Sequence, residues 1–181
     1  MVLLQGSSRE DGNTEYLSNL VVKGLPYKEI KLRDFNVRPI IDQRHDEHGF
    51  DPVDDDYDEM ITSVLEADLL IFATPIYWYG MSGHMKNFVD RWSQSLRDKR
   101  FDFKAEMSKK KAMVVLCGGD HPRVKGFPLI QQFQYIFDFV SMPFEDYVIG
   151  HARKPGDIKN DVDALQKARL LNEQLLKVEK M

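Results

Sequence analysis

Short apolar runs alternate along the chain with longer stretches in which apolar residues recur at helical spacing. The runs predict five strands, and most are apolar on both faces, as expected for strands inside a parallel sheet. The runs are Val2–Leu4, Tyr27–Leu32, Leu69–Ala73, Ala112–Leu116 and Tyr147–Ile149.

The stretches between and after these runs predict five amphipathic helices. Their apolar positions are Leu17, Leu20 and Val21; Tyr57, Met60, Ile61, Val64 and Leu65; Met85, Phe88, Val89, Trp92 and Leu96; Leu129, Ile130, Phe133, Ile136, Phe137 and Val140; and Ala164, Ala168, Leu171, Leu175 and Val178. The cluster Asp11–Thr14 and the triplet Asp54–Asp56 are expected to cap two of these helices. Strict alternation predicts an α/β fold in which helices cover both faces of a parallel sheet.

A polar stretch from Arg33 to Asp54 shows no clear periodicity. It is long for a loop in a compact domain, which indicates a functional lid or a contact between subunits. His45 and His48 in this stretch have a spacing that a metal site could use, but a solvated loop is the favoured interpretation, because nothing aligns the two imidazoles. The run Lys109–Lys111 is expected to be a solvated turn before a strand.

Length and charge narrow the range of functions. The chain has 181 residues, which suits a single domain over 1–181, and its 25 Lys and Arg against 29 Asp and Glu give a net charge of −4. This mild balance argues against nucleic acid or a membrane surface as the main partner. No apolar run approaches the ~20 residues of a membrane span, no signal peptide is evident, and the single cysteine permits no internal disulfide. We therefore expect a cytoplasmic protein.

The first chemically distinctive segment is Gly6–Thr14, which follows the first strand and opens a helix. It is rich in small and hydroxyl residues and carries Arg9. Unpaired N–H groups at a helix N-terminus suit a phosphate, although a simple capping cluster explains the same residues. The segment matches neither the P-loop nor the Gly-x-Gly-x-x-Gly pattern.

The second segment, Thr74–Gly83, is aromatic and follows the third strand. An exposed apolar wall at a strand end suits a flat ring system or another subunit, and both uses are compatible.

The third segment, Cys117–Arg123, begins with Cys-Gly-Gly at the end of the fourth strand. Paired glycines let the backbone approach a ligand closely. The same residues fit the Cys-x5-Arg spacing of cysteine phosphatases, but Val124 stands where a hydroxyl residue usually supports the thiolate. A lone cysteine at a buried strand end is most simply a small core residue.

Together these features resemble a known family. The loop Gly6–Thr14, the pair Asp55 and Asp56, the segment Thr74–Gly83 and the stretch Lys86–Arg91 are similar to the flavodoxin-like NAD(P)H-dependent FMN reductases. That family includes quinone reductases and the flavoproteins labelled Trp repressor-binding proteins. The resemblance covers nearly the whole chain and implies a three-layer sandwich, with a five-stranded parallel sheet of order 2-1-3-4-5 and FMN at its C-terminal edge. One branch of the family carries an iron–sulfur cluster, but no cysteine precedes the Asp-Asp pair here.

The resemblance also implies which residues bind the cofactor. The FMN phosphate would be held by Ser7, Ser8, Arg9, Asn13 and Thr14. The ribityl chain and one edge of the isoalloxazine ring would be lined by Pro75, Ile76, Tyr77, Trp78, Tyr79 and Gly80. The other side would be closed by Gly118, Gly119 and Asp120. Asp120 or His121 would influence the electronics of the ring, and no side chain is predicted to be catalytic.

The implied activity is ping-pong oxidoreduction. NADPH or NADH, between which the sequence does not choose, would pass a hydride to FMN and leave, and a quinone, a nitro or azo compound or a free flavin would then accept the electrons. The alternatives are a flavodoxin-type electron carrier, an FMN-binding regulatory protein and, less favoured, a Cys-x5-Arg phosphatase. The long polar loop and the aromatic loop indicate a homodimer or tetramer in which the neighbour helps to cover the flavin.

Overall fold

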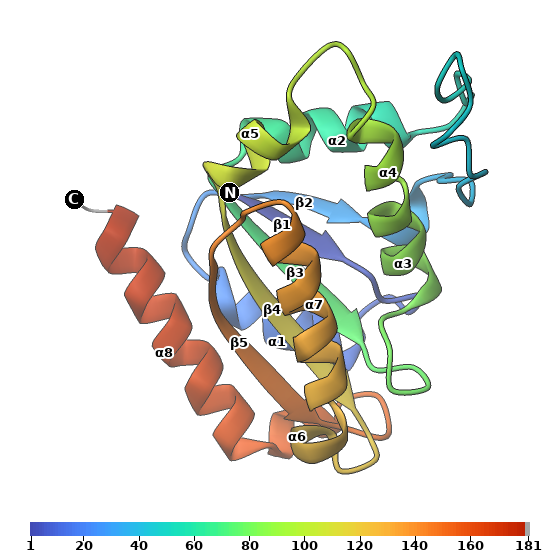
Figure 1. Ribbon diagram of the computed structural model, residues 1–181. Coiled ribbons are helices and arrows are strands. Elements are labelled where there is room, and N and C mark those ends of the chain that lie inside the picture. The colour runs from blue at the N-terminus through green and yellow to red at the C-terminus, as the bar shows by residue number, and fades with distance from the viewer. Residues whose placement is uncertain (180–181) are drawn as a thin grey trace.

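A computed structural model describes residues 1–179 of the chain (Figure 1). Its centre is a sheet of five parallel strands in the order β2-β1-β3-β4-β5. The strands are β1 (Val2–Gln5), β2 (Lys28–Lys31), β3 (Leu69–Pro75), β4 (Lys111–Gly118) and β5 (Phe144–His151). Each contains or lies within one of the predicted apolar runs, and the implied order 2-1-3-4-5 is confirmed.

Helices cover both faces of the sheet. One face carries α1 (Asn13–Val21) and α8 (Val162–Glu179), and the other carries α2 (Tyr57–Glu66), α3 (Gly83–Asp90), α4 (Trp92–Ser95), α5 (Phe103–Ser108) and α7 (Phe127–Phe139). The shorter elements are α6 (Pro122–Lys125) and the 3₁₀ turns η1 (Leu32–Asp34) and η2 (Asp157–Asn160). Side chains alternate between two cores, because neighbouring residues of a strand point to opposite faces. Ile71 therefore packs with the first pair of helices and Phe72 with the second group.

The helices differ from the prediction in two respects. The helix predicted from Met85 to Leu96 is interrupted at Arg91, whose buried side chain reaches the backbone and carboxylate of the loop before α2. In addition, α5 and α6 were not predicted. Helices of one or two turns present too few apolar positions to reveal a helical period.

The carboxylates before α2 were expected to cap the helix, but their main hydrogen bonds are to the long polar loop. The side chain of the N-cap residue Asp56 makes no capping bond and accepts a hydrogen bond from the Asn36 backbone instead. Asp55 does accept from the Tyr57 backbone at 3.2 Å, but it also accepts from the Arg38 backbone at 2.9 Å. The carboxylates therefore tie the two ends of the long polar loop together.

Lys110 also contradicts the sequence prediction of a solvated turn. Its side chain is buried, and its ammonium group donates to the carbonyls of Leu65 and Ala67. Desolvation lowers the pKa of Lys110. The lysine satisfies carbonyl groups at the end of α2.

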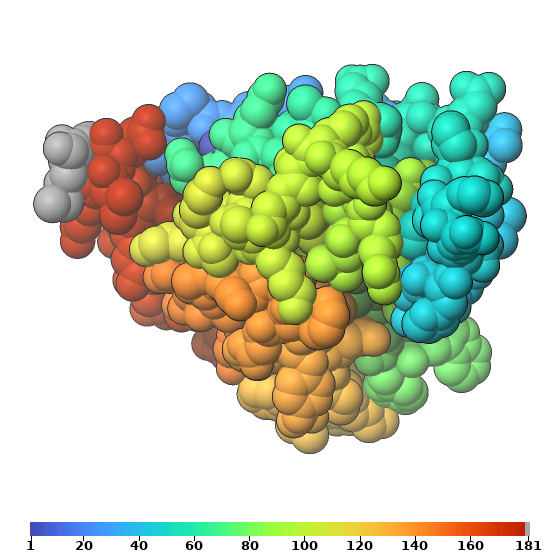
Figure 2. Space-filling model, turned by 45° about the horizontal axis from the view of Figure 1, so that its top comes forward, coloured from blue at the N-terminus to red at the C-terminus, as the bar shows by residue number. Residues whose placement is uncertain are grey.

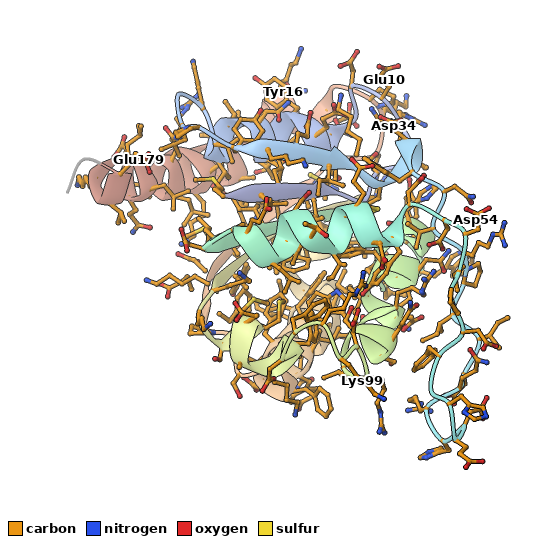
Figure 3. The ribbon with its side chains drawn as sticks, turned by 90° about the horizontal axis from the view of Figure 1, so that it is seen from above. Glu10, Tyr16, Asp34, Asp54, Lys99 and Glu179 are labelled. Carbon is orange, nitrogen blue, oxygen red and sulfur yellow. The ribbon has the colours of Figure 1, made fainter. Side chains whose placement is uncertain are left out.

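The loop between η1 and α2 contains no helix or strand and extends away from the body of the protein. In Figure 3 it projects well beyond the sheet, with Asp34 and Asp54 labelled near its two ends. Gln43 and Asp51 hold its two arms together through paired hydrogen bonds of 2.7 and 3.0 Å. Among the described helices, none is long and apolar enough to cross a membrane.

Candidate functional site

The loops that follow β1, β3, β4 and β5 meet at one edge of the sheet, toward the lower right of Figure 1. Backbone hydrogen bonds continue the strand register into these loops. Gly6 donates to the Ala73 carbonyl and Ile76 to the Cys117 carbonyl, each at 2.7 Å. Open parallel sheets bind ligands at this edge, where the strand order reverses.

A cavity of about 600 Å³ lies between the four loops. It is lined by every predicted cofactor-binding residue except Ser8 and Gly80. The residues that line it are Ser7, Arg9, Gly12, Asn13, Thr14, Pro75, Ile76, Tyr77, Trp78, Tyr79, Cys117, Gly118, Gly119, Asp120, Pro122, Lys125, Gly126, Ala152 and Arg153. Three segments far apart in the sequence, which we predicted from separate patterns, thus share one site.

The loop after β1 presents groups suited to an anion. The N-cap of α1 is Gly12, which has no side chain to cap the helix, so N–H groups of the first turn remain open toward the cavity. The Ser7 hydroxyl is engaged with the Arg9 backbone, donating to its carbonyl at 3.0 Å and accepting from its N–H at 3.1 Å. Within residues 1–179 the Arg9 guanidinium has no hydrogen-bond or ion-pair partner.

The Asn13 side chain, which is expected near the phosphate, forms hydrogen bonds with the loop after β5. Its side-chain N–H donates to the Lys154 carbonyl at 2.9 Å, and its side-chain oxygen accepts from the N–H groups of Gly156 and Ile158 at 2.9 and 3.4 Å. Asn13 thereby fastens the loop after β5 to the start of α1.

The aromatic segment forms a tight turn at the mouth of the cavity. Tyr77 and Gly80 exchange two backbone hydrogen bonds of 3.0 Å. The two central residues, Trp78 and Tyr79, adopt the left-handed conformation with φ of +49° and +64°. The Trp78 side chain is 96% exposed, while Tyr77 and Tyr79 are about half exposed. These rings are therefore outside the core, in agreement with the exposed apolar wall that the sequence predicted.

Side chains bind this turn to its neighbours. The Tyr79 hydroxyl donates to Asp120 at 2.8 Å, and Lys125 donates to the same carboxylate oxygen at 2.5 Å. The Lys125 ammonium and the Tyr79 hydroxyl lower the pKa of Asp120. On the other side, the hydroxyls of Ser8 and Tyr77 lie 3.3 Å apart. The loops are thus cross-linked around the opening.

Cys117 does not have the properties of a phosphatase nucleophile. It is only 5% exposed, and burial raises the pKa of its thiol to about 12. A nucleophilic cysteine needs a depressed pKa. Arg123 pairs with Asp161 and does not line the cavity, so Cys-x5-Arg forms no phosphate-binding unit here. His121 lies outside the lining too, as the N-cap of α6 in a left-handed conformation.

Sequence reasoning missed several cavity residues, and Lys125 and Arg153 are the charged ones. Arg153 is the second residue after β5, so the strand-end argument, applied to this loop as to the others, would have found it. Lys125 lies in α6, a helix too short to be recognised. Among residues 1–179, no group of three or more His, Cys, Asp or Glu side chains is placed to hold a metal ion.

Comparison with known proteins gives one consistent family. Residues 1–154 match the family described as NADPH-dependent FMN reductase. The chain is 51% identical over 172 residues to a Bacillus subtilis protein provisionally named NAD(P)H-dependent FMN-containing oxidoreductase YwqN, covering 94% of this chain and 95% of that one. It is 29% identical over 189 residues to the iron–sulfur flavoprotein MJ1083 of Methanocaldococcus jannaschii, covering 98% and 96% of the two chains. The solved structure of the Trp repressor binding protein from Bacillus subtilis superposes with a TM-score of 0.80 at 45% identity, covering 94% and 96%.

Proposed function

The chain belongs to the NADPH-dependent FMN reductase family, and we propose that its 600 Å³ cavity holds the FMN of this family. The protein is an NAD(P)H-dependent, FMN-containing oxidoreductase. We further propose that residues 1–181 act as one FMN-binding domain and that the electrons go to a small acceptor. The main support for the proposal is that the three predicted loops line the same cavity.

The cavity has the size and chemistry that FMN requires. Its volume lies within the range of about 300–1,000 Å³ typical of cofactor sites. The phosphate needs an anion site, and the uncapped start of α1 together with Arg9 offers one. The ring needs a flat apolar wall and close backbone approach, which Ile76, the aromatic turn and Gly118 provide. A Cβ on Gly118 would lie 3.1 Å from Ile76 and would crowd this wall.

Each group of residues then has its own task. The first loop holds the phosphate, and the aromatic turn shields one edge of the ring from water. The segment Gly118–Asp120 closes the opposite side, and the bond between Tyr79 and Asp120 keeps the two walls at a fixed separation. Ser8 and Gly80 act outside the cavity, Ser8 through Tyr77 and Gly80 by closing the turn.

We propose a ping-pong order in which NAD(P)H and the acceptor use the cavity that holds FMN one after the other. Bound FMN supplies the redox chemistry, taking electrons from NAD(P)H and giving them to the acceptor. The aromatic walls favour flat acceptors such as quinones, nitro compounds, azo compounds and free flavins. We assign no catalytic acid or base: the cavity thiol of Cys117 stays neutral, and Asp120 is already paired with Lys125.

We also propose that the protein self-associates as a dimer or tetramer. A second groove of about 620 Å³ between α3, α4 and α7 has an apolar lining that includes Trp92, Leu96 and Phe139. Tyr135 and Phe139 beside it are 64% and 59% exposed. Figure 2 shows the polar loop before α2 as a ridge along the edge next to α3 and α4. A groove and a ridge on adjoining surfaces suit contact with a second copy, which light scattering would detect as a multiple of 21.1 kDa.

We also propose that the protein is located in the cytoplasm. NAD(P)H is the reductant of this activity, and the single cysteine is free and buried. Both features agree with a reducing compartment.

The decisive test is the visible spectrum of the purified protein after incubation with FMN and gel filtration. Oxidised-flavin bands that co-elute with the protein and bleach with anaerobic NADPH or NADH would support the reductase. Restoration of the bands by a quinone, after the oxidised coenzyme has been removed, would support the ping-pong order. Bound flavin that neither coenzyme bleaches would favour an electron carrier, and absence of bound flavin would contradict the proposed site.

A further inference from the structure

Arg153 lines the cavity, and most of the hydrogen-bond donors of its guanidinium group have no partner among residues 1–179. It is an exposed residue in the loop after β5, and its Nε donates to the Gly119 carbonyl at 2.9 Å. In the described part of the chain, its two terminal guanidinium nitrogens have no hydrogen-bond or ion-pair partner. Several N–H donors and a full positive charge therefore remain available at the cavity.

The cavity has two other cations, Lys125 and Arg9, and among the described residues only Lys125 has a counter-charge. Lys125 is neutralised by Asp120 at 2.5 Å. Within residues 1–179 the Arg9 guanidinium also lacks a hydrogen-bond or ion-pair partner, but it lies on the loop after β1. The cavity therefore has two unneutralised guanidinium groups, and only Arg9 was expected from the sequence.

The position of Arg153 is fixed from several directions. Its Nε bond to Gly119 is supported by close packing, since a Cβ on Gly119 would lie 2.8 Å from the Arg153 Cγ. Asp157 accepts from the backbone N–H groups of Arg153 and Lys154 at 3.2 and 2.7 Å. Asn13 holds the same loop through the Lys154 carbonyl. Because the backbone of the loop and the Nε of Arg153 are already held, little further ordering is needed when the guanidinium binds a ligand.

We propose that Arg153 is an anion-binding residue of the flavin site, on a loop that Asn13 fastens to the start of α1. This inference rests on the proposed location of FMN. The ligand is the negative charge of the cofactor, for which FMN has two sources: the 5′-phosphate, and the ring system once it is reduced. Guanidinium groups suit both, because they present several parallel N–H donors to anionic oxygens.

Binding titrations of Arg153→Gln with FMN and with riboflavin, which lacks the phosphate, test the proposal. Glutamine removes the charge but keeps an amide that can donate to Gly119. If the phosphate is the source, FMN binds about tenfold more weakly or worse while riboflavin binding is unchanged. If the reduced ring is the source, the oxidised cofactors bind normally and the two-electron midpoint potential of the bound flavin falls. If the reduced flavin binds tenfold more weakly, the midpoint potential falls by about 30 mV.

Two other results would overturn the proposal. One is unchanged binding of both cofactors with an unchanged potential. The other is an equal loss for FMN and riboflavin without a change in potential, which would indicate a structural role of the loop. Arg153→Lys keeps the charge and must recover part of the loss; if it recovers none, charge is not the cause.

Two control variants and the wild-type chain separate this inference from the proposed function. Arg169→Gln, which removes an exposed arginine from α8, should leave both titrations unchanged. Arg9→Ala should weaken FMN binding through the first loop. If the wild-type chain binds no FMN, or if Arg9→Ala has no effect while Arg153→Gln does, the proposed location of the phosphate is at fault. If Arg9→Ala weakens binding and Arg153→Gln changes nothing, only the role of Arg153 is wrong.

Discussion

Arg91 and Asp55 form an ion pair in which both side chains are buried. Nη1 of the arginine lies 2.5 Å from Oδ2 of the aspartate, and the side chains are 2% and 1% exposed. The same guanidinium donates to the Arg38 carbonyl and lies 4.6 Å from the centroid of the Tyr57 ring. This pair joins the start of α4 to both ends of the long polar loop.

Arg91→Met should destabilise the protein strongly. The substitution leaves the Asp55 carboxylate buried without its partner, and breaking buried pairs typically costs about 3–5 kcal/mol. Urea denaturation followed by circular dichroism measures the loss. As a control, Lys86→Ala breaks the exposed pair with Asp90 and should change stability by less than about 0.5 kcal/mol. Equal effects of the two substitutions would contradict a stabilising role of the buried ion pair between Arg91 and Asp55.

The stability should also depend on pH through Asp55. Burial alone would raise the pKa of this carboxyl, but hydrogen bonds from Arg91 and the backbone lower it overall. A depressed folded-state pKa adds stability above the unfolded value of about 3.9, and that stability is lost as pH falls through the lower folded value. Asp55→Asn should therefore flatten the fall in thermal midpoint below about pH 4. Asp163→Asn, at a side chain 84% exposed, should preserve the slope of the wild type.

Gly119→Ala should weaken FMN binding without touching a charge. The new Cβ would lie 2.8 Å from the Arg153 Cγ and would push that side chain away. The effect should not add to that of Arg153→Gln, because both changes remove the same interaction. Fluorescence titration of the single and double variants tests this, with Gly83→Ala as a control where a Cβ meets nothing within 4 Å. Full additivity would argue for separate causes.

Tyr79→Phe should speed the release of FMN several-fold. The substitution removes the hydrogen bond to Asp120 that joins the two walls of the cavity, while the ring itself stays. Stopped-flow dilution of bound FMN measures the rate. Tyr135→Phe deletes a comparable exposed hydroxyl that contacts Gln131 on α7, and it should leave the rate unchanged. A rate for Tyr79→Phe equal to that of the wild type would show that the walls do not depend on this bond.

Trp78→Asn should raise stability and lower activity. Trp78 is held in the left-handed conformation, which costs a bulky residue about 1 kcal/mol or more and which asparagine tolerates better. Its exposed side chain contributes little packing energy to the fold. We expect a higher thermal midpoint together with slower NAD(P)H oxidation, whereas Trp78→Phe should keep most of the activity. A lower thermal midpoint for Trp78→Asn would falsify the prediction that the left-handed conformation of Trp78 destabilises the fold.

The long elements followed directly from the sequence. Ile71 and Phe72, which pack on opposite faces of the sheet, belong to a run that is apolar on both faces, and this pattern is typical of a central parallel strand. The break at Arg91 could not be predicted in the same way. At this position the Arg91 side chain contacts Asp55 and the Arg38 carbonyl, which lie 36 and 53 positions away in the chain.

The candidate site divides along the same line. The three loops at the strand ends could be predicted from the sequence, because small, aromatic and hydroxyl residues clustered beside apolar runs are a local signal. The folded structure was needed to see that Asn13 is bound to the loop after β5, that Lys125 is neutralised by Asp120 and that Arg153 lines the cavity with free donors. These facts concern pairs of groups brought together by the packing of α1, β4 and β5. Local patterns specify which elements form and which residues end them, whereas the partner of each polar side chain is fixed only when the strands take their order in the sheet.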